Sequence, residues 1–175
     1  MLVELFSQYR TEIVFLHVVS AVIWVGGMVA MRFAAHHSFQ MLDDTPVKIA
    51  RTAHALKRLF AIVSPFVIIL LITAITMAVG IGFRDAALDD TGHVVDDYAM
   101  VIYNLIHVKE AIWTIMALNL LAMILRRNKA QKLIDAGAYK QAGALLKIIG
   151  QYMVPLNIIL GIIAIYLGVF LRNAY

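Results

Sequence analysis

The chain has 175 residues, of which 62% are hydrophobic and 15% are charged. Soluble domains are about half apolar and about a quarter charged, so this composition disfavours a water-soluble fold. The chain has no cysteine, which excludes disulfides, thiolate metal sites, iron–sulfur clusters and covalently attached c-type haem. The net charge of +4 does not indicate a nucleic-acid partner, because the basic residues gather at the ends of apolar stretches.

Four apolar stretches each reach the length of about 20 residues that a hydrocarbon core of about 30 Å requires. They lie near Ile13–Ala35, Leu59–Gly82, Ala99–Leu125 and Ile148–Phe170. Backbone groups in lipid must be hydrogen-bonded within their own segment, so these stretches are predicted to be helices. We therefore expect an all-α fold, an integral membrane four-helix bundle that forms one transmembrane domain over residues 1–175. The first stretch has no small-residue cleavage site, so no cleavable signal peptide is expected.

The segments between the stretches differ in charge. The first and third links, with the adjoining helix ends, hold eleven of the fifteen basic residues and three acidic ones. These basic residues are Arg32, Lys48, Arg51, Lys57, Arg58, Arg126, Arg127, Lys129, Lys132, Lys140 and Lys147. The positive-inside rule places these two links in the cytoplasm and both termini in the periplasm of a bacterial inner membrane. Both links are expected to continue as helices, and membrane lipid is the expected surrounding partner.

Ionisable residues inside a span are costly and are by default candidates for function. His17 is fifteen residues from Arg32, and His107 is nineteen residues from Arg126. At 1.5 Å per residue the two histidines differ in depth by only about 6 Å. Two imidazoles at similar depth on neighbouring antiparallel helices predict a bis-histidine site for haem or metal in the bundle. The alternative for either histidine is a hydrogen-bonded core residue without a ligand.

Residues near the two histidines are compatible with a cofactor. Trp24 and Gly27 share a stripe with His17 at helical spacing, and the glycine either leaves room for a macrocycle or allows helix packing. Glu110 lies one turn from His107 and is placed to orient its imidazole. Lys109 points elsewhere, either to snorkel or to pair with a propionate or with Glu110. Arg58 is a topology signal, a lipid head-group contact or a propionate partner.

Three segments together resemble the HemJ family of four-helix membrane proteins. Leu16–Arg32 (LHVVSAVIWVGGMVAMR) resembles the opening helix of the family, and His37 matches a histidine that follows the terminal arginine. Lys57–Pro65 (KRLFAIVSP) resembles the start and mid-span proline of its second helix, and Leu105–Ala111 (LIHVKEA) its His-x-Lys element. The Trp-x-Gly-Gly pattern is also similar to that of CopD-type copper-resistance proteins.

The HemJ resemblance implies a b-type haem with His17 and His107 as ligands, and oxidation of protoporphyrinogen IX in haem synthesis. It implies catalytic or supporting roles for Lys109, Arg32 and His37. Electrons would pass to quinone or to a membrane redox partner. Two alternatives stay open, a CopD-like copper transport protein and a cofactor-free packing or assembly subunit of a membrane complex. A homodimer also stays open.

Overall fold

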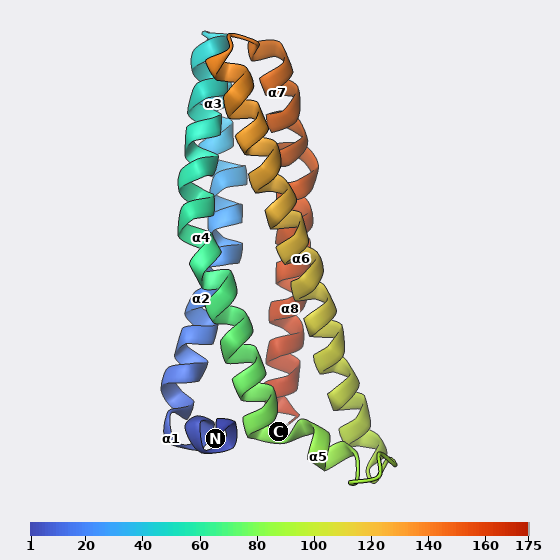
Figure 1. Cartoon of the computed structure of the whole chain (residues 1–175). Coiled ribbons are helices and arrows are strands. Elements are labelled where there is room, and N and C mark those ends of the chain that lie inside the picture. The colour runs from blue at the N-terminus through green and yellow to red at the C-terminus, as the bar shows by residue number, and fades with distance from the viewer. Residues whose placement is uncertain (175) are drawn as a thin grey trace.

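The structure is a computed structural model that describes residues 1–174, and it confirms the all-α membrane bundle. Four helical stretches are long and apolar enough to cross a membrane, and each matches one of the predicted spans, the second of which was predicted to run one residue further, to Gly82. These stretches cover Arg10–Gln40, Thr45–Ile81, Asp97–Asp135 and Tyr139–Asn173. Both described ends of the chain lie at the same end of the bundle, as an even number of crossings requires (Figure 1). Which side of the membrane that end faces stays a prediction.

The first and last of these stretches each contain a short π-helical segment. The first consists of α2 (Arg10–Ala30), the π-helix Met31–Ala35 and α3 (His36–Gln40). The last consists of α7 (Tyr139–Ile148), the π-helix Ile149–Met153 and α8 (Val154–Asn173). Short π-helical insertions in α-helices are frequent at functional sites, so these two segments mark a place to inspect.

The two central spanning helices are unbroken. They are α4 (Thr45–Ile81), which passes through Pro65, and α6 (Asp97–Asp135). Each begins at an aspartate cap: the Asp44 and Asp96 carboxylates accept hydrogen bonds from the third backbone N–H beyond them, at 3.0 Å and 2.9 Å. At 1.5 Å per residue the 39 residues of α6 exceed the bilayer thickness, so its last turns extend beyond the hydrocarbon. The first and third links are therefore largely helical, as expected.

Two short helices lie at the end that carries the termini. They are α1 (Leu2–Gln8) and α5 (Phe83–Ala87). Phe6 of α1 is buried against Gly80 of α4, where any side chain larger than hydrogen would collide with its ring. Gly82 ends α4 in the left-handed conformation, φ 77°, which turns the chain into α5. These helices anchor the edge of the bundle.

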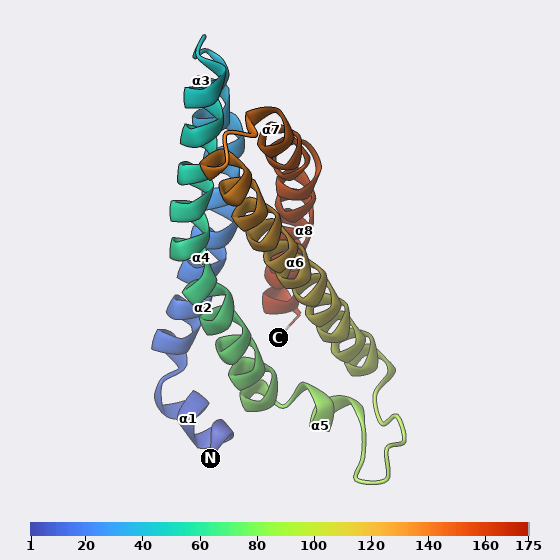
Figure 2. The ribbon, with the colours of Figure 1, turned by 45° about the horizontal axis from the view of Figure 1, so that its top comes forward.

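The arrangement of the four spanning helices decides which residues can meet. α2 packs against α4 and α8, and α6 also packs against α4 and α8, so α2 and α6 occupy opposite corners. They run in the same direction and diverge toward the end that carries the termini (Figures 1 and 2). A core of Trp24, Met28, Val63, Met123 and Val154, each at most 1% exposed, holds the four helices together.

A polar pair joins α6 to the last stretch inside this core. The Asn119 amide donates 2.8 Å hydrogen bonds to the Met153 carbonyl and to the Asn157 side chain. Asn157 is fully buried and donates in return to the Met116 carbonyl at 3.3 Å. Interhelical amide bonds of this kind fix the contact between helices in lipid, where apolar packing gives little directional preference.

Candidate functional site

His17 lies inside the bundle and is held by α4. Its Nδ1 atom is 3.0 Å from the Thr73 hydroxyl oxygen, and that hydroxyl donates its own hydrogen to the Ile69 carbonyl at 2.8 Å. Because the hydroxyl hydrogen is used in this way, the oxygen accepts from Nδ1–H of the imidazole. The Nε2 atom then carries the lone pair. A histidine fixed through one ring nitrogen with the other free is the usual state of a metal ligand.

Lys109 also faces the interior. Its amine nitrogen lies 3.3 Å from the position that a side-chain carbon on Gly168 of α8 would occupy, so the glycine makes room for it. Among residues 1–174, no carboxylate lies within ion-pair distance of this amine. The charge of Lys109 is close enough to act on the His17 imidazole. Lys109 and His17 therefore lie in the same half of the bundle, the half near the termini (Figure 1).

His107 lies on a different side of α6. Its side chain is 53% exposed, and its Nδ1 atom contacts the Glu110 carboxylate at 2.9 Å, as the one-turn spacing predicts. The ring of Tyr103 meets the imidazole edge-on at 4.6 Å between centroids. Residues two apart on a helix differ by about 200° in direction, so Lys109 can face inward only while His107 faces outward.

The expectation of neighbouring antiparallel helices for the two histidines is wrong. In an up-and-down bundle the first and third spanning helices run in the same direction, and here they lie at opposite corners. His17 faces Thr73 of α4, whereas His107 faces away from the bundle. The structure does not bring these two imidazoles together within one chain.

Two buried indole groups lack hydrogen-bond acceptors. Within residues 1–174, Trp24 Nε1 and Trp113 Nε1 are the buried side-chain nitrogens or oxygens without a partner. Trp24 is 1% exposed, and Trp113 packs against the same core cluster one turn beyond Lys109. An unsatisfied buried donor is uncommon and needs a physical explanation. A bound molecule that offers an acceptor to the interior would provide one.

Gly27 lies at a helix contact, whereas Arg58 lies on the surface. A side-chain carbon on Gly27 would come within 2.9 Å of Leu59 and 3.6 Å of Val63, so this glycine allows close contact between α2 and α4. Arg58 is exposed on α4 near the end where the span begins. The structure shows no contact of Gly27 or Arg58 with Thr73 or His17.

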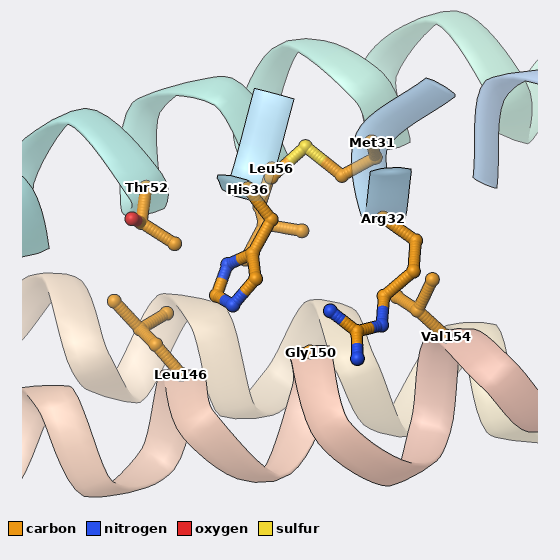
Figure 3. Close-up of a pocket in the computed structure, with 8 residues that line it drawn as sticks. All are labelled: Met31, Arg32, His36, Thr52, Leu56, Leu146, Gly150 and Val154. Carbon is orange, nitrogen blue, oxygen red and sulfur yellow. The ribbon is translucent and has the colours of Figure 1, made fainter. Parts of the chain in front are cut away.

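A small cavity lies between the two π-helical segments, far along the bundle from His17. Its volume of about 10 Å³ has room for about one water molecule. Arg32 and His36 extend into it beside Gly150, between α4 and the α7–α8 stretch (Figure 3). His37, predicted to serve the site, is exposed, and His36 takes the inward position. Sequence reasoning missed His36 because adjacent histidines give no sign of which one faces inward.

The residues around His17 suit a b-type haem in their donor chemistry. The Nε2 atom of His17 carries the lone pair that iron would need, and within residues 1–174 no carboxylate pairs with Lys109 to compete with a propionate. Within the described part of the chain, no group of three or more histidine, cysteine or acidic side chains forms a ready metal site. Comparison with protein-family models, with curated proteins and with solved structures finds no match to this chain.

Proposed function

We propose that this protein is a membrane-embedded b-type haem protein that carries out electron transfer or oxidoreduction, in the manner that its resemblance to the HemJ family implies. The observation that carries the proposal is the His17 imidazole, which is fixed by Thr73 with its Nε2 atom free. Haem chemistry would supply one-electron transfer at the iron. Oxidation of protoporphyrinogen IX, with quinone or a membrane partner as electron acceptor, is the specific reaction that this resemblance implies.

The protein's own residues would perform three tasks. Thr73 holds His17 in one tautomer and one orientation, which favours binding through Nε2. Lys109 presents a positive charge in an apolar surrounding, where it suits a carboxylate of the haem or of a porphyrin substrate. The four apolar helices keep water from this half of the bundle, which strengthens both interactions.

His107 has a different place in this proposal. Because it faces away from His17, it would bind the same iron only after α6 rotated by about half a turn. Within one chain we therefore assign the interior ligand role to His17. His107 would not hold the same haem in this arrangement of the helices.

The test is a visible spectrum of the full-length protein purified in detergent. We expect a Soret band with sharp α and β bands on reduction, and loss of these bands in His17→Ala. His93→Ala, in the exposed loop before α6, is the control and should keep the spectrum. Bound copper without a Soret band would support the CopD-like alternative instead. A protein that binds neither would support a packing or assembly subunit.

His107→Ala distinguishes the prediction made from the structure from the one made from the sequence pattern. The structure predicts that the spectrum survives this substitution, since the imidazole faces outward and is bonded to Glu110. Loss of haem from both histidine variants would show that α6 adopts a different rotation when haem is bound.

A further inference from the structure

Arg127 is a buried cation near the end of the bundle that carries the first and third links. Its side chain is 7% exposed, and its Nε atom donates a 3.0 Å hydrogen bond to the Ala53 carbonyl of α4. Its other nitrogens donate to Asn128 at 3.2 Å and to Gln131 at 2.8 Å. All three acceptors are neutral. A buried guanidinium needs an anion to offset its lost hydration.

Within residues 1–174, no carboxylate lies within ion-pair distance of Arg127. Asp135 acts on the guanidinium charge from farther away and is linked to it through Gln131, which donates to that carboxylate at 2.9 Å. Three of the guanidinium N–H groups have acceptors, so further donors stay available. The charge is therefore only partly satisfied by the protein.

Arg127 lines an open groove of about 210 Å³ between α4 and α6. The α4 wall carries Lys57, Phe60 and Ser64, which share one helix face at spacings of three and four residues. The α6 wall carries Ile124, Arg127 and Asn128. Lys57, Arg127 and Asn128 lie toward the end of the groove that is near the first and third links. Phe60 and Ile124 lie deeper, so the groove is charged at one end and apolar at the other.

The depth of the groove matches a lipid head group. Lys57 lies two residues before the predicted span Leu59–Gly82, and Arg127 lies two residues after Leu125, where the third predicted span ends. Both charges are thus at the boundary between hydrocarbon and head groups, on the predicted cytoplasmic side. Basic pockets between spanning helices on that side are suited to anionic head groups.

We propose that this groove binds one anionic phospholipid of the cytoplasmic leaflet. Arg127 and Lys57 contact the phosphate, Asn128 donates to it, and an acyl chain lies along Phe60 and Ile124. The shared chemistry is that of a phosphate anion, and the apolar half of the groove selects a lipid over free phosphate. The site is separate from the His17 region and does not depend on a haem.

The experiment uses full-length protein in detergent, titrated with phosphatidylglycerol or phosphatidylcholine, with bound lipid counted by native mass spectrometry. Phosphatidylglycerol should bind with one high-affinity equivalent per chain and raise the thermal unfolding temperature, and phosphatidylcholine should do neither. Lys57→Gln should weaken this binding about fivefold, the effect of one basic residue near a head group. Lys57 is exposed and has no hydrogen bond or ion pair within residues 1–174, so this variant leaves the fold intact.

The matched control is Arg126→Gln. Arg126 precedes Arg127 and is exposed outside the groove, so its removal changes the net charge equally but should leave binding as it is. The proposal is overturned if both lipids bind alike, or if Arg126→Gln weakens binding as much as Lys57→Gln. It is also overturned if sodium phosphate displaces the lipid, since the groove would then be a site for the free ion.

Discussion

Thr73 offers the sharpest test of how the interior histidine is held. Valine has nearly the shape of threonine, so Thr73→Val removes the hydroxyl and leaves the packing of a side chain that is 5% exposed. The imidazole of His17 then loses the hydroxyl acceptor and keeps only the Leu70 carbonyl as a hydrogen-bonding neighbour, so the cost is at most that of an unsatisfied buried donor, about 1–3 kcal/mol. Loss of the group that orients a metal-binding histidine typically lowers affinity about 10–100-fold. That range corresponds to a loss of about 1.4–2.7 kcal/mol of haem-binding free energy.

Thr76 is the matched control for this substitution. It lies on the same helix, is also 5% exposed, and its hydroxyl donates only to the Ile72 carbonyl of its own helix at 2.8 Å. Thr76→Val therefore removes the same group at the same burial without touching His17. Thr73→Ser keeps the hydroxyl and should restore the parent behaviour.

The assay is titration of each haem-free protein with haemin, followed at the Soret band, with thermal unfolding measured in parallel. We expect haem affinity to fall about 10–100-fold in Thr73→Val and to stay near the parent value in Thr76→Val and Thr73→Ser. Equal haem affinity in the two valine variants would refute the assignment of Thr73 as the group that positions His17.

Three further predictions follow from other parts of the molecule. Lys109→Met should keep the protein inserted but lower the haem reduction potential by on the order of tens of millivolts, because a nearby positive charge favours the reduced iron. The measurement is a redox titration, with Lys140→Met at an exposed position as the control. Equal potentials in the two variants would show that Lys109 only fills space. In the loop before α6, hydrogen bonds from the Thr91 hydroxyl, and from backbone N–H groups including that of His93, lower the pKa of Asp89. The stabilisation of the loop by these hydrogen bonds is complete above the ordinary aspartate pKa and is lost as the pH falls through the lowered pKa of Asp89. Amide hydrogen exchange in the loop should therefore accelerate only in that lower pH range. Asp89→Asn should remove this pH dependence. A reporter fused to the C-terminus should be active only in its periplasmic form, and cytoplasmic activity would reverse the topology.

The amino-acid sequence by itself determined the fold class, because bilayer thickness fixes the length of a spanning helix. Each predicted span coincides with one helical stretch to within one residue, and the helical character of the first and third links followed from the same pattern. The one-turn spacing of His107 and Glu110 also predicted their contact. These are local properties, set by hydropathy and by 3.6 residues per turn, and a single sequence carries them.

Only the tertiary structure decided which way the polar residues face. In a soluble helix the polar side marks the solvent, but in a membrane both the core and the lipid are apolar, so the pattern does not distinguish them. Lys109 and His36 face inward, whereas the sequence predicted inward positions for His107 and His37. Which residue faces inward depends on how each helix is rotated against its neighbours. Thr73 and Arg127 were likewise recognisable only once α4 was packed against α2 and α6, since their partners lie 56 and 74 residues away in the chain.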